Sequence, residues 1–212
     1  MPFLATLDAL APALHLIAVF VFATSGALAA AAKRQTFVTF AFFALVTGVG
    51  GGTVRDLLIE APVFWMHDSI VPLVCLGAAL IVWVAPEGLF RPRALDWFDA
   101  VGLAAYSVFG ADKALRFGAD PVPAMLMGVI TACVGGIIRD TLSGQPSILM
   151  RPEVYVSASA LAAAFYVCAL MLGVPVAVAG LAAFCAGFAL RAAAIHWGWG
   201  LPLYRAKPGR SE

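Results

Sequence analysis

Two Arg-Asp pairs, Arg55-Asp56 and Arg139-Asp140, stand within otherwise apolar stretches of the chain. At the centre of a membrane helix each such charge costs about 2.5–3.5 kcal/mol, so retained charges usually face a partner or a water-filled path. Neighbouring residues of a helix point about 100° apart, so we expect each charge to pair with a group on another helix. Local pairing of each arginine with its own aspartate at the membrane interface is the alternative.

The same spacing of threonine, glycine and arginine recurs at both pairs. The trios are Thr47, Gly51 and Arg55, and Thr131, Gly135 and Arg139. At intervals of four residues each trio lies on one helix face and spans about 12 Å. A hydroxyl, a bare backbone and a cation aligned in this way suit the wall of an ion pathway.

Two further charges, Asp112 and Lys113, lie in another apolar stretch, whereas the matching residues nearer the N-terminus are Leu28 and Ala29. This difference predicts that the two halves of a pathway are not alike. The candidate pore and gating residues are therefore Arg55, Arg139, Asp56, Asp140, Thr47, Thr131, Asp112 and Lys113.

Glycine clusters precede both Arg-Asp pairs. Each glycine inside a helix costs about 1 kcal/mol relative to alanine. Such clusters permit a kink or an unwound turn, whose free carbonyls can ligate a cation where water or protein lines the gap. Close helix packing is the alternative, because Gly48 and Gly52 form a G-x-x-x-G motif. The candidate hinges are Gly50, Gly51, Gly52, Gly135 and Gly136.

An internal repeat relates the two regions at a constant offset of 84 residues, as from Arg55 to Arg139. The offset also matches glycines, a threonine, an aspartate, a leucine and a proline without a gap. Each copy holds three apolar stretches. Because an odd number of spans reverses the direction of the chain, the copies are inverted about an axis in the membrane plane, as in transporters and pores.

Seven apolar stretches are long enough to position these residues, since a membrane helix needs about 20 residues. Hydrophobic residues make up 63% of the 212 residues and charged residues only 12%, against about 45–50% and about 25% in soluble domains. The predicted spans are 12–32, 36–59, 69–85, 97–116, 121–143, 154–172 and 174–195.

We therefore predict an all-α integral membrane protein, in which seven transmembrane helices form two inverted three-helix repeats plus a seventh helix. The single transmembrane domain spans residues 1–212. Repeat one covers about 12–86, repeat two about 96–172, and the extra helix about 174–195.

Basic residues gather on one side of the predicted bundle. The positive-inside rule then places the C-terminus in the cytoplasm and the N-terminus outside. The other side receives little beyond Arg116. The residues that carry this asymmetry are Lys33, Arg34, Arg91, Arg93, Arg151, Arg205, Lys207 and Arg210.

Several functional classes find no support in the sequence. The net charge of +1 predicts no nucleic-acid partner. The cysteines and histidines are scattered without ligand spacing, so no metal site is expected. No nucleophile–base pair or phosphate-binding loop appears, so we expect neither an enzyme nor a catalytic residue.

The repeated strings resemble those of the trimeric intracellular cation channel family, in its prokaryotic branch. The resemblance covers about residues 12–205 and is carried by Gly-Gly-x-x-Arg-Asp in both halves and by Ser-Gly-Ala-Leu-Ala-Ala at 25–30. Asp-Ala-Val-Gly-Leu at 99–103, Pro146 and Glu-Val-Tyr at 153–155 add to it. One departure is Val134, which stands where the first copy has Gly50. The Lys-Glu-Val string of animal members is absent.

The resemblance implies a homotrimer in a bacterial-type inner membrane, with one pore in each protomer. It implies that the second and fifth helices kink at their glycines and line this pore with the first and fourth. The expected permeant ions are potassium or sodium. No cofactor is expected. Besides the permeant ions, the expected bound species is lipid. Our hypothesis is that Asp56, Asp140 and kink carbonyls attract the cation, whereas Arg55 and Arg139 gate the pore.

Two other functions remain open at this level. A small secondary transporter could use the same inverted-repeat pathway, and its transport would saturate with substrate. A non-conducting scaffold would keep the buried charges for stability alone.

Overall fold

The computed structural model describes residues 2–86, 89–90 and 93–204, with side chains from Pro12 onward. This part of the chain forms seven α-helices and two short 3-10 helices. The helices are α1 (Pro2–Ala32), α2 (Phe37–Leu58), α3 (Ile70–Val84), α4 (Ala94–Arg116), α5 (Pro121–Leu142), α6 (Val156–Met171) and α7 (Val176–Trp197), with η1 (Phe64–Met66) after α2 and η2 (Ile148–Met150) after α5.

Proline and glycine set several of the helix ends. Pro121 lies in the first turn of α5, where its missing N–H removes no helical hydrogen bond. Pro86 follows the end of α3 closely. Gly198 has a left-handed φ of 68° and ends α7. The predicted spans therefore match the helices to within a few residues, except that α1 begins at Pro2 and not at residue 12, and the prediction of seven helices is confirmed.

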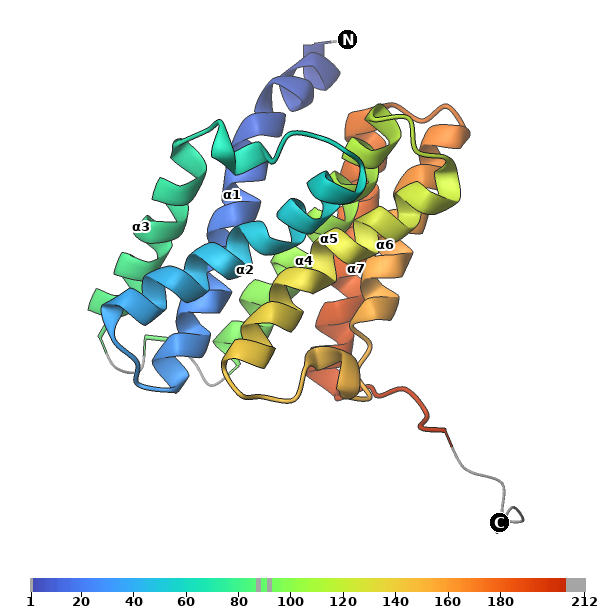
Figure 1. Ribbon diagram of the computed structural model, residues 1–212. Coiled ribbons are helices and arrows are strands. Elements are labelled where there is room, and N and C mark those ends of the chain that lie inside the picture. The colour runs from blue at the N-terminus through green and yellow to red at the C-terminus, as the bar shows by residue number, and fades with distance from the viewer. Residues whose placement is uncertain (1, 87–88, 91–92, 205–212) are drawn as a thin grey trace.

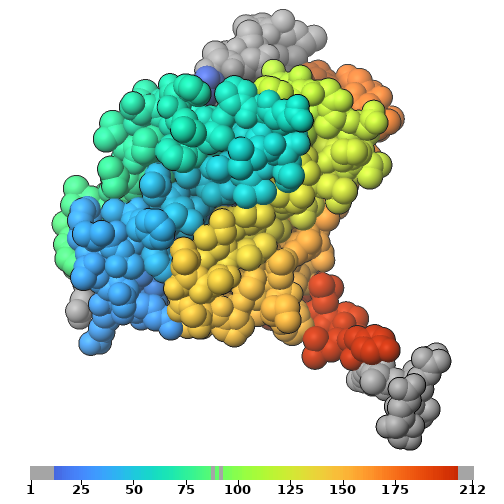
Figure 2. Space-filling view, in the orientation of Figure 1, coloured from blue at the N-terminus to red at the C-terminus, as the bar shows by residue number. Residues whose placement is uncertain are grey.

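The two repeats are α1–α3 and α4–α6, with α7 added at the end. Within each repeat the first two helices pack together, and across the repeats α1 contacts α4 and α2 contacts α5. Figure 2 shows α2 and α5 meeting diagonally across one side of the protein. The inverted arrangement is evident in Figure 1, because α2 runs upward and α5 runs downward.

The two ends of the bundle are named here by the chain. The face at which α1 begins, at the top of Figure 1, is the N-face, and the opposite face, at which α7 ends, is the C-face. Lys33, Arg34, Arg93 and Arg151 lie in the connections of the C-face. Arg91, Arg205, Lys207 and Arg210 lie outside the described residues.

Four helices are long and apolar enough to cross a bilayer: α1 from Pro12, α2, α5 and α7. The helices α3 and α6 are apolar but have only 15 and 16 residues. At 1.5 Å per residue they are about 22–24 Å long, somewhat shorter than the hydrocarbon layer of about 30 Å. The 23 residues of α4 suffice in length, but this helix carries more charged residues than any other described helix.

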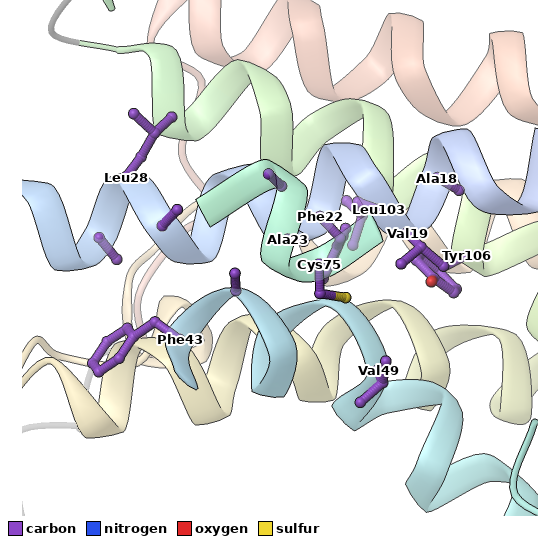
Figure 3. Packing of buried hydrophobic residues seen from close by; sticks show 14 of the residues in the cluster. Ala18, Val19, Phe22, Ala23, Leu28, Phe43, Val49, Cys75, Leu103 and Tyr106 are labelled. Atoms are coloured by element: carbon purple, nitrogen blue, oxygen red, sulfur yellow. The ribbon is translucent and has the colours of Figure 1, made fainter. Parts of the chain in front are cut away.

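The core is built around α1. Small residues such as Ala18 and Ala23 let neighbouring helices approach it closely, as expected where helices pack in lipid. In Figure 3, Phe22 on α1 lies beside Leu103 and Tyr106 of α4, and Cys75 of α3 reaches toward α2. Large apolar side chains cover the outside of α3, α6 and α7 and suit contact with lipid. They include Leu73, Leu80, Leu161, Phe165, Val178 and Leu181.

Candidate functional site

Each Arg-Asp pair lies in the last turn of its helix, Arg55-Asp56 at the N-face end of α2 and Arg139-Asp140 at the C-face end of α5. Local pairing, which the sequence left as the alternative, is present in both pairs, together with the expected contacts to another helix. Arg55 Nη2 lies 2.7 Å from Asp56 Oδ1, and Arg139 Nη2 lies 2.9 Å from Asp140 Oδ1. The long, flexible arginine side chain folds back over the helix end and so overcomes the angle of about 100° between adjacent residues.

The second carboxylate oxygen of each aspartate holds the following loop. Asp56 Oδ2 accepts a hydrogen bond of 3.0 Å from the backbone N–H of Phe64. Asp140 Oδ2 accepts one of the same length from the N–H of Ile148. Both donors lie eight residues ahead and begin a 3-10 helix. The repeat therefore preserves the whole helix end and its loop, in which Pro62 and Pro146 occupy matching positions.

The N-face cluster gains a cation from the other repeat. Lys113 Nζ of α4 lies 2.7 Å from Asp56 Oδ1. Two cations, Arg55 and Lys113, thus share one carboxylate, and the cluster carries a net charge of +1. His15 of α1 lies beside it, with its ring 5.2 Å from the ring of Phe64. We define the N-face cluster as Arg55, Asp56 and Lys113.

The C-face cluster gains an anion instead. Arg139 Nη1 pairs with Asp99 Oδ1 of α4 and donates a hydrogen bond of 3.1 Å to Ser25 Oγ of α1. One cation is thus shared by Asp99 and Asp140, and the net charge is −1. Arg139 and Asp99 are each only 1% exposed. We define the C-face cluster as Arg139, Asp140 and Asp99.

Sequence reasoning placed Asp99 in a motif but did not list it as a site residue. A signal was available, because an aspartate within an apolar stretch needs a partner. The offset of 84 also sets Asp99 against His15, a position at which the two repeats differ in charge. Ser25 was also not listed, because its contact with Arg139 joins two segments that lie far apart in the sequence.

Asp112 lies apart from both clusters. Its carboxylate accepts a hydrogen bond of 2.7 Å from the Tyr166 hydroxyl on α6 and pairs with Arg116 at 2.7 Å. Of the two charges predicted on α4, Lys113 joins the N-face cluster, whereas Asp112 faces α6.

The glycines of α2 and α5 lie where these helices cross. A Cβ atom added at Gly51 would collide with the carbonyl oxygen of Thr131, and one added at Gly135 would lie 2.5 Å from the carbonyl oxygen of Thr47. The repeat relates these two contacts to each other. Each threonine thus lies against a glycine of the opposite copy, and both threonine side chains are buried. The structure therefore gives these residues a close-packing role.

Both glycine-rich helices are α-helical throughout, so neither contains an unwound turn in this conformation. In Figure 3 the ribbon of α2 turns away from α1 beyond Val49. The other glycines also meet close neighbours: Ile138 beside Gly50, the ring of Phe64 beside Gly52, and the Tyr155 hydroxyl beside Gly136. Hinge motion at these glycines stays a prediction.

Aromatic side chains fill the centre between the two clusters. Phe22 and Tyr106 occupy equivalent positions in the repeat, and their ring centroids lie 5.3 Å apart. The Tyr106 hydroxyl donates a hydrogen bond of 3.0 Å to the carbonyl oxygen of Gly48, inside the glycine-rich part of α2. Tyr106 is only 2% exposed and Phe22 only 1%, so both rings are packed inside the bundle.

A cavity of about 510 Å³ leads from the C-face to the C-face cluster. Lys33 and Arg151 line it, and Lys33 is exposed. Asp96 lines its wall. Arg139, Asp140 and Asp99 also line it, so the buried negative cluster adjoins a space that can hold water.

Comparison with known proteins agrees with this geometry. The family model described as glycine transporter matches residues 12–87 and again 96–171, which are the two repeats. A crystal structure of the TRIC trimeric intracellular cation channel orthologue from Rhodobacter sphaeroides is 42% identical to this chain. It superposes with a TM-score of 0.83 over 88% of this chain and 97% of its own. This chain belongs to the prokaryotic TRIC channel family.

Two bacterial relatives extend the TRIC family match. A UPF0126 membrane protein of Vibrio cholerae is 36% identical over 204 residues, which cover 90% of this chain and 82% of the relative. The UPF0126 inner membrane protein YadS of Escherichia coli K12 is 35% identical over 202 residues, which cover 90% and 94%. This TRIC homologue is therefore a multi-pass protein of the bacterial inner membrane and not an enzyme.

Proposed function

We propose that this TRIC homologue is a passive, potassium-permeable channel with a separate pore in each protomer. The observation that carries the proposal is the pair of buried Arg-Asp clusters at opposite faces of one protomer, linked through the crossing of α2 and α5. The pore runs between them along α1, α2, α4 and α5. Charges placed at both ends of such a path are the usual mark of ion permeation.

The aspartates answer the difficulty of arginines in a cation pore. Each arginine is paired with at least one carboxylate, so its repulsion of a cation is offset where the cation would pass. We propose that Arg55 and Arg139 act as gates: breaking their pairs releases a carboxylate toward the path. Arg139 also holds α5 to α4 and α1, so its release would free α5 to move.

The centre supplies a second barrier. The Tyr106 hydroxyl caps the Gly48 carbonyl, and the Phe22 and Tyr106 rings close the space between the clusters. Opening requires that these rings separate. We propose that Gly50, Gly51, Gly52, Gly135 and Gly136 permit this by bending, since glycine lowers the resistance of a helix to a kink. Their close contacts across the α2–α5 crossing would then change together.

We also propose an assembly and an orientation for this TRIC homologue. The Rhodobacter sphaeroides relative is described as trimeric, and we propose that this chain is also a homotrimer. The exposed apolar side chains of α3, α6 and α7 suit contact with lipid and with neighbouring protomers. We place the C-face in the cytoplasm, because its connections carry Lys33, Arg34, Arg93 and Arg151.

Single-channel recording of the purified protein in a planar bilayer tests the channel function. Under a potassium gradient we expect discrete current steps that reverse near the potassium equilibrium potential. Arg55→Ala and Arg139→Ala should change the open probability. Silence at every voltage would contradict the channel proposal, and unchanged gating and selectivity in both variants would contradict the role of the arginines.

A secondary transporter is the second candidate, favoured by the description of the matching family model as glycine transporter. Glycine uptake into proteoliposomes discriminates the two. A transporter would show uptake that saturates with glycine concentration and no unitary currents. The channel proposal predicts potassium flux without any requirement for glycine.

A further inference from the structure

A third buried arginine lies outside both clusters. In the described part of the chain the largest fully buried side chains include three arginines, and Arg191 of α7 joins Arg55 and Arg139 among them. A cation inside a membrane helix is costly and is usually retained for a function. Because α7 belongs to neither repeat, the duplicated Arg-Asp string does not account for this charge.

Two residues just before α6 hold the guanidinium of Arg191. Its Nη2 lies 2.7 Å from Glu153 Oε2, and its central carbon lies 5.1 Å from the centroid of the Tyr155 ring. A guanidinium suits both contacts, because its planar group can pair with a carboxylate while it stacks on an aromatic face. Arg191 therefore supports the Tyr155 ring from the side of α7.

The Tyr155 hydroxyl, at the far end of this ring, reaches the C-face cluster, where it interacts with the carboxylate of Asp99. A Cβ atom added at Gly136 would lie 2.9 Å from this hydroxyl and 3.5 Å from both Arg139 Nη2 and Asp99 Oδ1, so the three groups surround one point. Because Tyr155 is buried in a closely packed interior, its ring moves only if neighbours such as Arg191 move.

The C-face end of α7 is fastened to the segments that carry these groups. Arg93 Nη1, just before α4, donates a hydrogen bond of 3.1 Å to a carbonyl oxygen in the last turn of α7. Beyond α7, the N–H of Leu201 donates a hydrogen bond of 2.8 Å to the carbonyl oxygen of Pro152. Gly200 pairs with Glu153 in an antiparallel β-bridge. These links set the position of α7 relative to both α4 and the segment before α6.

Among the described residues the N-face has no equivalent of this arrangement. The offset of 84 sets Val71 against Tyr155 and Ser69 against Glu153. Neither a valine nor a serine can stack on a guanidinium or pair with its charge. The contacts of α7 therefore bear on one end of the proposed pore, the C-face end.

We propose that Arg191 is a positioning residue for the C-face gate: through Tyr155 it holds Asp99 against Arg139 and so stabilises the closed conformation. This inference rests on the proposed function, in which the channel opens when the pairs of Arg139 break, and it gives the seventh helix a role in gating. Arg191 lies outside the lining of the C-face cavity, so it acts on the gate and not on the passing ion.

Single-channel recording in a planar bilayer under a potassium gradient tests this role, with Arg191→Gln as the main variant. Open probability should rise by about fivefold, as expected when one contact of the closed conformation is lost, and unitary conductance should stay that of the wild type. Arg191→Lys keeps the charge and loses the planar group, so its open probability should lie between the two. A purely structural role would lower the number of active channels and change neither quantity.

A double variant tests whether Arg191 acts through the Tyr155 hydroxyl. Tyr155→Phe keeps the ring and removes the group that reaches Asp99, so its open probability should rise as it does in Arg191→Gln. Adding Arg191→Gln to Tyr155→Phe should then give no further rise, because the two residues act in one chain of contacts. Two independent rises that multiply in the double variant would overturn the proposal.

Glu153→Gln supplies the test if Arg191→Gln does not fold, which size-exclusion chromatography shows. Open probability should rise by about twofold, since Glu153 is 35% exposed and water weakens the pair that is lost. Arg34→Gln is the matched control, because it makes the same substitution at an exposed arginine of the C-face, and it should gate as the wild type does. Wild-type gating in folded Arg191→Gln or Glu153→Gln, or an equal rise in Arg34→Gln, would overturn the proposal.

The wild-type recording separates this role from the proposed function. Wild-type protein that passes potassium, while Arg191→Gln gates as the wild type does, would refute the role of Arg191 and leave the channel standing. Wild-type protein that shows no unitary current would refute the channel and this role together.

Discussion

The N-face and C-face clusters share one local design and differ in net charge. In both, an arginine folds back onto the next aspartate, whose second oxygen holds the loop eight residues ahead. Two positions outside the repeated string then set the charge. Lys113 adds a cation to the N-face cluster where the other copy has Ala29, and Asp99 adds an anion to the C-face cluster where the other copy has His15.

This difference shows how an inverted repeat separates structure from function. The duplicated string builds a helix end in which the arginine, the aspartate and the following loop are linked by hydrogen bonds, which stabilises either copy. The first and fourth helices, which diverge more, set the charge at each mouth of the proposed pore. A pore with a positive cluster at one end and a negative cluster at the other is expected to conduct unequally in the two directions.

Removing the arginines should have the largest effect and should reveal the difference between the two clusters as a difference in stability. Arg139→Ala leaves two buried carboxylates unpaired, so we expect a loss of about 3–5 kcal/mol in stability. Arg55→Ala leaves Asp56 with Lys113, so its loss should be smaller, at about 1–3 kcal/mol. Thermal unfolding in detergent, followed by size-exclusion chromatography, measures both. Equal losses would contradict the difference in charge that we assign to the clusters.

Filling the glycine crossing should have the next largest effect. Gly51→Ala places a Cβ atom against the Thr131 carbonyl, and Gly135→Ala does the same at Thr47. Overpacking of this kind costs about 1–3 kcal/mol. Gly77→Ala in α3 is the control, because a Cβ atom there meets no neighbour within 4 Å. Unfolding temperatures should fall for the first two variants only. A similar fall for Gly77→Ala would contradict the claim that close packing at the α2–α5 crossing causes the loss of stability.

Replacing the central tyrosine should have a smaller effect. The variant Tyr106→Phe places a phenylalanine at this position in both repeats, since the equivalent residue is Phe22. The variant loses one buried hydrogen bond of the closed conformation, worth about 1 kcal/mol, so open probability should rise by about fivefold. Tyr166→Phe removes a hydroxyl that faces Asp112 instead and should gate as the wild type does. Single-channel recording measures both, and a Tyr106→Phe channel with wild-type gating would contradict this barrier.

The smallest effect is expected from Lys113→Ala, which copies Ala29 of the other repeat. It removes one positive charge that is 24% exposed at the N-face. Potassium conductance should rise by less than about twofold at low salt, because the local potential becomes less positive. The gain should disappear near 1 M KCl, where the screening length is about 3 Å. Conductance that does not change at low salt would place Lys113 outside the path.

Most of the fold could be predicted from the sequence, whereas only part of the site could. Apolar length and prolines located the helices, and the constant offset of Arg55 and Arg139 revealed the inverted repeat, because both signals are periodic along the chain. The partners of the charges were not predictable in this way. The link from Arg139 to Asp99 spans 40 residues and joins two helices, so it depends on packing that no local pattern contains.

Local geometry also limited the sequence reasoning. The angle between adjacent residues argued against an Arg55-Asp56 pair, yet the flexible arginine reaches its neighbour at the helix end. The glycines were interpreted mainly as hinges, whereas the structure shows them first as contacts at a helix crossing. Asp112 could not be assigned to α6 without knowing that Tyr166 faces it.

The central claim is that an ion passes between two clusters of opposite charge, and the current–voltage relation of single channels in symmetric KCl tests it most directly. The variant Lys113→Ala with His15→Asp gives the N-face the residues that the C-face has at Ala29 and Asp99. We predict that wild-type channels rectify and that this variant gives a nearly linear relation. A linear wild-type relation, or a variant that rectifies as strongly as the wild type, would contradict the claim.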